Sequence, residues 1–312
     1  MKTIFMGTPD FSVYIANALR ENEFDIQCVV TQPDKESGRG KKIHYSPVKE
    51  WAIKNNIEIL QPIKAKDSEF IEKIKSLKPE LIVTAAFGQI IPIDILEIPT
   101  YGCINVHASL LPKYRGASPI QQSLFDGEKE TGITIMYMNE KMDEGDIILQ
   151  RKIEILPSDN TGSLFDKLAK EGALAIIDYK KMLENGKPVG FPQNSINATY
   201  CKKISKEQGN IDWNKSAQEI FNCIRAMTPY PGAYSFLSGK RIKIISVTYE
   251  KAEHDFIAGK IISANKNEIT VSCKDGFIKI LSLQPEGKNI LSAKDFLNGH
   301  KLTAHEAFER KI

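Results

Sequence analysis

Polar residues alternate with apolar ones in the middle of the chain, where Asn105, His107 and Ser109 stand two positions apart. On an extended strand, residues two apart project to the same face, so these side chains would line up together. Polar groups in a packed core each need a partner, and a cluster near the carboxyl end of a strand in an α/β sheet belongs in a ligand crevice. There an amide and an imidazole can converge on a reacting carbonyl. The alternative is a core histidine hydrogen-bonded to the asparagine.

A second polar cluster, residues 139–146, follows directly after an apolar strand pattern. Taken alone, a solvated acidic turn explains it equally well. Beside Asn105 and His107, one carboxylate there would orient and charge the imidazole and accept protons, as acyl-transfer chemistry requires. We predict that Asp143 is this carboxylate, because Asp146 begins the next strand.

The elements that must position these residues alternate between strand and helix, which predicts an α/β fold with a mainly parallel sheet. The expected strands are Lys2–Met6, Ile26–Thr31, Glu80–Ala86, Gly102–Ser109, Thr131–Met138 and Asp146–Ile155. Helices are expected after Asp10 as N-cap, from Ser46-Pro47 to about Asn55, and over Ser163–Glu184 with Gly186 as a stop.

The length of 312 residues favours two domains, which we expect at 1–186 and 209–312 with a linker at 187–208. In the second domain Ser216 and Glu219 form a capping box ahead of an amphipathic helix. Five short strand patterns follow, at 233–237, 241–250, 259–264, 268–273 and 277–284. They suggest a small barrel of the OB type, although strand counting does not separate it from other five-stranded β-domains.

Composition excludes several classes of protein. The five cysteines form no CxxC pair and the five histidines no HExxH, so neither a disulfide scaffold nor a metal site is expected. No apolar run is long enough to span a bilayer, and the N-terminus reads as a strand without a signal peptide, so we expect a cytoplasmic protein. The net charge of +3 does not by itself indicate a nucleic-acid binder, but residues 209–312 hold 15 Lys and Arg against 11 Asp and Glu.

The segment 102–121 resembles the signature of the folate-dependent formyltransferases, and Asp143 falls where that family keeps its aspartate. Further segments resemble the branch of the family that acts on methionyl-tRNA, and the resemblance therefore covers nearly the whole chain. These segments are Gly7–Phe11, Gln32–Lys42, Ile211–Trp213, Ile224–Gly232 and Leu283–Lys288.

The resemblance implies a Rossmann-like catalytic domain that transfers a formyl group from 10-formyltetrahydrofolate to the α-amine of methionyl initiator tRNA. Asn105 and a protonated His107 would then stabilise the tetrahedral oxyanion. Asp143 would hold His107 in its charged form and help to move a proton from the amine toward the leaving folate. No metal is implied, and a monomer is the default expectation.

The resemblance also implies ligand-binding segments. The folate would lie along Ser109, Leu110, Leu111 and Pro112 and against the backbone near Phe87, Gln89, Ile90 and Ile91 and near Tyr137–Asp143. Phe87, Ile90 and Ile91 are also plain core candidates. The Leu111-Pro112 bond is expected to be cis. The loop 33–46 would engage the tRNA, with Arg39 making directed contacts and Lys41 and Lys42 meeting phosphates, whereas composition alone fits a solvated loop. The barrel would be a second tRNA contact.

Four other interpretations stay open at this point. A glycinamide-ribonucleotide formyltransferase would share the folate and the Asn, His and Asp residues, but it leaves the second domain unexplained. A sugar-nucleotide formyltransferase can carry an additional C-terminal domain. A formyltetrahydrofolate hydrolase would use water in place of the amine. A non-catalytic RNA-binding module would need the basic loop but not Asn105, His107 and Asp143.

Overall fold

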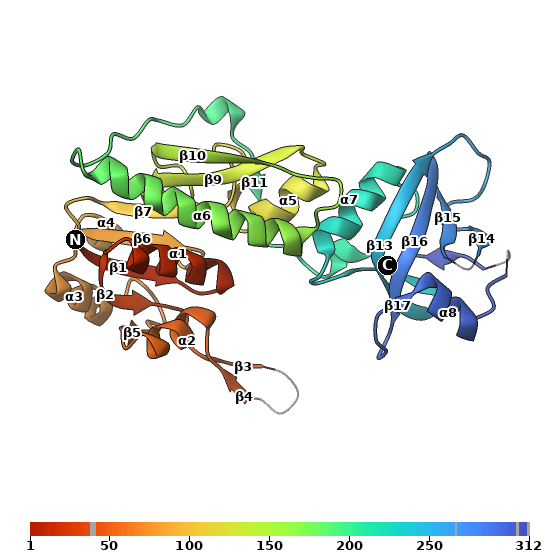
Figure 1. Cartoon of the computed structure of the whole chain (residues 1–312), viewed down its shortest axis with the longest axis horizontal. Coiled ribbons are helices and arrows are strands. Elements are labelled where there is room, and N and C mark those ends of the chain that lie inside the picture. The colour runs from red at the N-terminus through yellow and green to blue at the C-terminus, as the bar shows by residue number, and fades with distance from the viewer. Residues whose placement is uncertain (38–41, 266, 304–305, 311–312) are drawn as a thin grey trace. The chain divides into compact units, whose positions relative to one another are not determined.

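The computed structural model describes residues 1–37, 42–265, 267–303 and 306–310, which form two compact units (Figure 1). The first unit comprises Met1–Pro119, Glu130–Glu154 and Phe165–Cys201. The second comprises Ile120–Lys129, Ile155–Leu164 and the chain from Lys202 onward. The segment 187–208 is thus divided between the units at residue 201.

The first unit is built on a seven-stranded sheet in the order β10-β9-β7-β6-β1-β2-β5. The five strands from β7 to β5 are parallel, whereas β9 runs antiparallel to β7 and β10 antiparallel to β9. The predicted mainly parallel α/β fold is therefore confirmed. The strands are β1 (Lys2–Gly7), β2 (Asp25–Val30), β5 (Glu58–Leu60), β6 (Leu81–Ala85), β7 (Cys103–His107), β9 (Glu130–Tyr137) and β10 (Ile147–Glu154).

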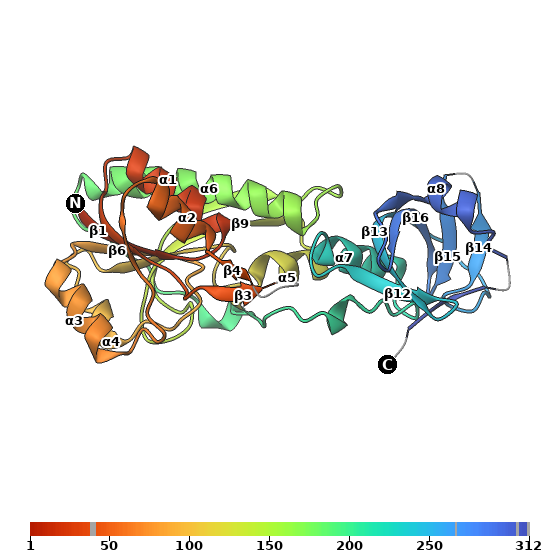
Figure 2. The same ribbon diagram turned by 90° about the horizontal axis from the view of Figure 1, so that it is seen from below.

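Helices cover both faces of this sheet, so that its strands are buried on two sides. Figure 2 shows α1 and α6 on one side of the sheet and α3 and α4 on the other. The helices of this unit are α1 (Asp10–Glu21), α2 (Pro47–Lys54), α3 (Ser68–Leu77), α4 (Ile93–Leu96) and most of α6 (Thr161–Leu183). Short strands form two further pairs, β3 (Lys35–Ser37) with β4 (Lys42–His44) and β8 (Arg115–Gly116) with β11 (Tyr200–Cys201).

The predicted strands occur in the structure with shifts of one or two residues at their ends. The largest consequence concerns β7, which ends at His107, so Ser109 lies beyond the strand and not on the face that it was expected to share. The prediction that Asp10 caps α1 is wrong, because the N-cap is Pro9 and Asp10 is the first helical residue. A carboxylate there still faces the positive end of the helix dipole. Ser46 caps α2 as predicted.

The second unit is an antiparallel, barrel-like sheet packed around one apolar core, as predicted. Its strand order is β14-β15-β16-β13-β12-β18, and β17 pairs with β16. A bridge between Lys260 and Ala307 joins the segments that lead into the two edge strands, and Figure 2 shows the strands curving around a common interior. The strands are β12 (Ala233–Leu237), β13 (Lys240–Lys251), β14 (Ile261–Ala264), β15 (Ile269–Cys273), β16 (Gly276–Pro285), β17 (Leu291–Ser292) and β18 (Phe308–Glu309).

The second unit contains α7 (Ala217–Met227), α8 (Ala293–Gly299) and nearly all of α5 (Pro119–Phe125). The predicted capping box is present at the start of α7, where the Ser216 hydroxyl and backbone hydrogen-bond to Glu219 and lower the pKa of its carboxyl to about 2. Two 3-10 turns, Ser195–Asn197 and Glu207–Gly209, lie on the path between the units.

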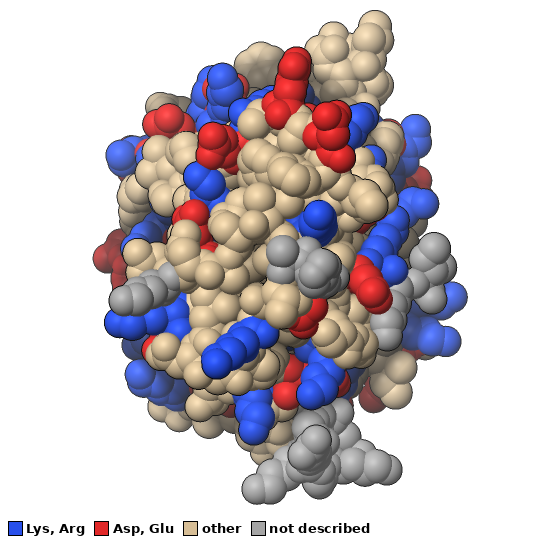
Figure 3. All heavy atoms as spheres, turned by 90° about the vertical axis from the view of Figure 1, so that its right-hand side faces the viewer, with Lys and Arg blue, Asp and Glu red and all other residues tan. Residues whose placement is uncertain are grey.

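Within the described residues, no helix has the length and hydropathy needed to cross a membrane. No cluster of His, Cys, Asp and Glu side chains in the same residues could hold a metal ion. Cys28 and Cys103 are buried free thiols, and burial raises the pKa of each to about 12, so both remain protonated. In the space-filling view of Figure 3, Lys and Arg side chains are interspersed with Asp and Glu over the face shown.

Candidate active site

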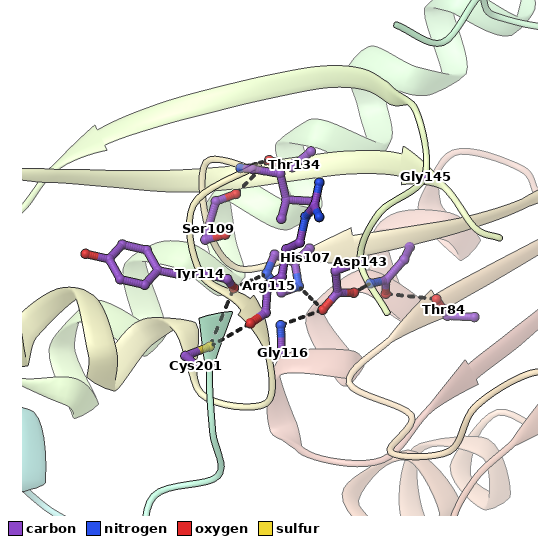
Figure 4. A network of polar contacts seen from close by, with 12 residues as sticks. Thr84, His107, Ser109, Tyr114, Arg115, Gly116, Thr134, Asp143, Gly145 and Cys201 are labelled. Carbon is purple, nitrogen blue, oxygen red and sulfur yellow. Dashed lines mark hydrogen bonds and ion pairs between the residues drawn. The ribbon is translucent and has the colours of Figure 1, made fainter. Parts of the chain in front are cut away.

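Strand β7 places Asn105 and His107 on the same face, at the carboxyl end of the sheet's parallel part. The strand lies between β6 and β9, and its register sets Asn105 opposite Thr84 on one side and His107 opposite Thr134 on the other. Alternation along the strand brings the two polar side chains together, while Ile104 and Val106 are buried in the core. Figure 4 shows Thr84, His107 and Thr134 within the network of polar contacts at this site.

The Asn105 side chain is oriented by Thr84. The Thr84 hydroxyl donates to Asn105 Oδ1 at 2.8 Å, which identifies the other end of the amide as its N–H end. Asn105 Nδ2 in turn lies 3.4 Å from Asp143 Oδ1. Because the amide nitrogen carries two hydrogens and Asp143 takes one, the second is available to an acceptor on a ligand.

His107 is buried, with 5% of its surface exposed, and both ring nitrogens have a neighbour. Nε2 lies 2.9 Å from the carbonyl oxygen of Tyr114, and since a carbonyl only accepts, Nε2 carries a hydrogen. Nδ1 lies 3.7 Å from Asp143 Oδ2. Nδ1 is therefore the atom that can gain or lose a proton while the bond to Tyr114 is kept.

Asp143 completes the cluster from the loop after β9. Its backbone is in the left-handed region, with φ of 55°, and its Oδ2 accepts the Gly116 backbone N–H at 2.8 Å. Gly145 follows it closely, and a Cβ added at Gly145 would meet the Tyr137 carbonyl oxygen at 1.8 Å, so the loop needs glycine there. The structure thus brings Asn105, His107 and Asp143 together at one site.

Sequence reasoning missed a second network that holds the Asp143 loop. Gln193 Nε2 donates to the carbonyl oxygens of Asp143 at 2.9 Å and of Gly145 at 2.8 Å. Its Oε1 accepts from Arg115 Nε at 3.1 Å and from Nη2 at 2.8 Å. Gln193 is therefore a positioning residue, because it ties the backbone on either side of the Asp143 carboxylate to a buried cation.

Arg115 is the centre of this network and is only 1% exposed. A buried guanidinium is tolerated only when its hydrogens are satisfied. Besides Gln193, its Nη1 lies 3.1 Å from the Tyr200 hydroxyl and 3.3 Å from Glu144 Oε1. Arg115 lies within the segment 102–121, so the sequence contained a signal for it. Gln193 lies in the segment 187–208, which was expected to be a linker, and nothing in the sequence indicated its role.

The residues expected to line the folate site along 87–91 are engaged within the protein. Phe87 and Ile91 are buried in a core cluster, in agreement with the alternative interpretation that they are core residues. The Gln89 amide accepts the Ala65 N–H at 2.7 Å and donates to the Pro62 carbonyl at 3.2 Å. Ile90, between them, is 72% exposed, so the interpretation of Ile90 as a core residue is wrong.

The segment 109–112 forms a tight turn beyond β7. The Ser109 hydroxyl is buried and donates to the Lys113 carbonyl at 2.6 Å, so it is used within the turn. The Leu111 N–H donates to the Thr134 hydroxyl, and the Leu111 side chain is also buried. Leu110 and Pro112 are half-buried. The Leu111-Pro112 bond is cis, as expected.

The residues expected to contact tRNA are described only in part. Arg39 and Lys41 lie outside the described residues, and Lys42 is the first residue of β4. The base of the β3–β4 hairpin is anchored at Asp34, whose carboxylate accepts from Lys49 Nζ at 2.5 Å and from Gln61 Nε2 at 2.9 Å. Hydrogen bonding to Lys49, and then to Gln61, lowers the pKa of Asp34.

Known proteins resemble the chain along nearly its whole length. Residues 1–179 match the family model described as formyl transferase, and residues 203–301 match the formyl transferase C-terminal domain. The methionyl-tRNA formyltransferase of Agathobacter rectalis is 45% identical over 96% of this chain and 96% of its own length. That of Dictyoglomus turgidum is 47% identical over 99% of both.

Solved structures share the fold at lower identity. A Helicobacter canadensis N-formyltransferase, in complex with folinic acid and dTDP-3-aminofucose, has a TM-score of 0.69 at 22% identity and covers 91% of this chain and 99% of its own. HypX from Aquifex aeolicus in complex with tetrahydrofolic acid has a TM-score of 0.64 at 17% identity, over 95% of this chain and 47% of its own. Since both domain models match in order and the relatives of 45–47% identity align end to end, the chain belongs to the methionyl-tRNA formyltransferases of the formyl transferase family.

Proposed function

We propose that the cluster of Asn105, His107 and Asp143 transfers the formyl group of 10-formyltetrahydrofolate to the free α-amine of methionyl initiator tRNA. Formylation of methionyl-tRNA is the activity of the family to which the chain belongs, and folate dependence is shared by that family. The observation that carries the proposal is the approach of the Asp143 carboxylate to 3.4 Å from Asn105 Nδ2 and 3.7 Å from His107 Nδ1.

The chemistry follows from this arrangement. The methionine nitrogen attacks the formyl carbon, a C–N bond forms, and the carbonyl oxygen gains negative charge. The free N–H of Asn105, with the imidazolium form of His107, stabilises that oxygen. The bond from the formyl carbon to N10 of the folate then breaks, and the proton lost by the amine is transferred to N10. Asp143 keeps His107 Nδ1 oriented during this transfer.

The surfaces available for the folate fit a flat, partly apolar ring. Ile90 is exposed in the segment 87–91, and the half-buried Leu110 and Pro112 each expose part of their apolar surface. Ligand pockets commonly combine such apolar walls with a few polar groups that fix orientation. We therefore assign the folate to these residues, with Ser109, Leu111, Phe87, Gln89 and Ile91 shaping the walls from behind.

The four other interpretations of the sequence predict different formyl acceptors. A ribonucleotide amine or an amino-sugar nucleotide would be formylated by the first two, water would replace the amine in a hydrolase, and an RNA-binding module would transfer nothing. Solved sugar N-formyltransferases share the fold at 21–24% identity, whereas the methionyl-tRNA enzymes reach 45–47% over nearly the full chain. The second unit is also unexplained by a single-domain enzyme.

One assay tests the proposed function against these alternatives. The protein is supplied with 10-formyltetrahydrofolate and, in separate reactions, charged initiator tRNA, a ribonucleotide amine, an amino-sugar nucleotide or buffer alone. We expect formylation of methionyl-tRNA at a rate at least tenfold above the others. Faster transfer to a small amine, or release of formate without an acceptor, would refute the proposal.

The loop 33–46 provides a separate prediction about tRNA recognition. Arg39→Ala should weaken tRNA-dependent turnover and leave the affinity for tetrahydrofolate unchanged, because the arginine is proposed to contact nucleic acid only. Joint removal of the Lys41 and Lys42 charges should also flatten the salt dependence of tRNA binding, since fewer counterions are released when fewer phosphates are neutralised. Lys73→Ala is the matched control, because Lys73 is paired with Glu58.

Titrations of tRNA at several ionic strengths, with folate affinity measured in parallel, check this prediction. If the loop variants and the control bind tRNA alike with one salt slope, the loop is an ordinary solvated excursion. Recognition would then rest on the second unit, for which we also propose tRNA binding. We further propose that the protein acts as a monomer in the cytoplasm.

A further inference from the structure

The outer face of the β12–β13 pair in the second unit combines aromatic and basic side chains. Along β12, Ala233, Ser235 and Leu237 are buried, so the alternating Tyr234 and Phe236 are directed to the other side of the sheet. The register pairs Tyr234 with Lys243 and Phe236 with Arg241 on β13. Because directly paired residues share a face, two aromatic rings and two cations lie together there.

Arg241 is held on this face by stacking. Its guanidinium lies 3.7 Å from the centroid of the Tyr234 ring, and Tyr234 packs edge-on against Phe236 with centroids 5.9 Å apart. The Arg241 Nε atom is buried and has no hydrogen-bond partner. The side chain is thus fixed in place before any ligand arrives, and less conformational entropy is lost on binding.

No anion neutralises Arg241 within the described part of the chain. The other arginines there each reach a side-chain oxygen: Arg20 to Asn55, Arg115 to Gln193 and Glu144, Arg151 to Glu171 and Asp178, Arg225 to Asn222, and Arg310 to Asp212. Arg241 and Lys243 have no ion pair among these residues. Two carboxylates lie near these strands: Glu309 pairs with Phe236 on β18, and the Glu286 backbone N–H donates to the Arg241 carbonyl oxygen at 3.2 Å. Both residues are exposed, and neither forms an ion pair with Arg241 in the described structure.

We infer that this face, formed by Tyr234, Phe236, Arg241 and Lys243, binds the phosphodiester backbone of the tRNA substrate. The inference rests on the proposed function, which makes a tRNA the macromolecular substrate, and it names the surface of the second unit that holds it. A planar guanidinium whose terminal N–H groups have no partner among the described residues matches a phosphate, and a lysine beside it adds a second charge. The aromatic rings provide a platform for an unpaired base.

The test compares tRNA binding by the Arg241→Gln/Lys243→Gln variant with that of the wild-type protein at several salt concentrations. We expect weaker binding, and a slope of log affinity against log salt that is reduced by roughly 0.7–0.9 for each phosphate that the variant no longer neutralises. At saturating tRNA, kcat should be unchanged, because these residues do not belong to the catalytic cluster. Lys279→Gln on the same barrel is the control, since Lys279 is already paired with Glu250 at 2.7 Å.

A second pair of variants tests the stacking without removing a charge. Tyr234→Phe keeps a ring under the guanidinium and should bind tRNA as the wild type does, whereas Tyr234→Leu removes the ring and should weaken binding. Thermal unfolding of each variant verifies that the barrel is intact. Unchanged affinity or an unchanged salt slope in the Arg241/Lys243 variant overturns the inference. Failure of the wild type to formylate methionyl-tRNA would instead overturn the proposed function, and the two failures are therefore distinguishable.

Discussion

Replacement of Asn105 by alanine is expected to lower kcat for formylation of methionyl-tRNA about 10²–10³-fold, the loss that follows removal of one oxyanion donor. The variant loses the amide N–H that the Thr84 bond holds in position. Thr84 itself keeps a partner, because its hydroxyl also lies 3.1 Å from the Ile104 carbonyl, so the fold should tolerate the change. Steady-state kinetics at saturating tRNA and folate measure the effect.

Asn139 offers a matched control for this prediction. It is an exposed asparagine just after the neighbouring strand β9, and its side chain only accepts the Lys141 backbone N–H. Asn139→Ala should leave kcat within about twofold of the wild-type value, as expected of a surface substitution. A loss of only threefold in Asn105→Ala would show that Asn105 is structural.

Replacement of His107 by alanine should abolish turnover while tRNA still binds. Because Nε2 is bonded to the Tyr114 carbonyl, Nδ1, next to Asp143, is the imidazole atom that can donate to the oxyanion and move a proton. Proton-transfer groups of this kind contribute about 10²–10⁴-fold. Because the tRNA-binding residues proposed above lie on other segments, the dissociation constant for tRNA should not change. The two measurements together separate chemistry from recognition.

The His107 prediction fails if the variant retains more than about a tenth of the wild-type kcat. It also fails if turnover and tRNA affinity fall in parallel, because the histidine would then act through the fold. Asp143→Asn tests the same site without a change of volume. It keeps a group that can accept the Gly116 N–H but removes the charge that faces Nδ1, and should also lower kcat strongly.

The sequence was sufficient to predict the part of the site that depends on a single strand. Alternation places Asn105 and His107 on one face of β7 whatever surrounds the strand. Ser109 shows the limit of that argument, because the strand ends at His107 and the Ser109 hydroxyl bonds within the following turn. Where a strand ends depends on its neighbours in the sheet, which alternation does not reveal.

Residues that act across long sequence separations were not predictable. Arg115 and Gln193 are 78 positions apart, and they meet because the chain around 199–201 returns to pair with β8. A two-residue strand has no recognisable period, so nothing in the pattern indicated this return. Helix α3 was also missing from the predicted elements, but its signal was present in the sequence. Phe70 and Ile74 stand at helical spacing and become the buried face of the helix.

Burial of the residues in the proposed folate site was also not predictable from the sequence pattern. An apolar residue near a crevice reads identically in the sequence whether it lines the crevice or supports it from the core. Phe87 and Ile91 are in the core, whereas Ile90 between them is exposed. The folate assignment of this segment stays a proposal, and the contribution of each side chain depends on how β6 leads into its following loop.

The central claim is that Asn105, His107 and Asp143 together move a formyl group from the folate to methionyl-tRNA. The most direct measurement follows a labelled formyl group from 10-formyltetrahydrofolate, using the wild-type protein and the Asn105→Ala/His107→Ala variant. Mass spectrometry of the amino acid released from the tRNA should show labelled N-formylmethionine with the wild type and none above background with the variant. Formyl transfer by the variant within tenfold of the wild-type rate, or label recovered as formate, would contradict the account.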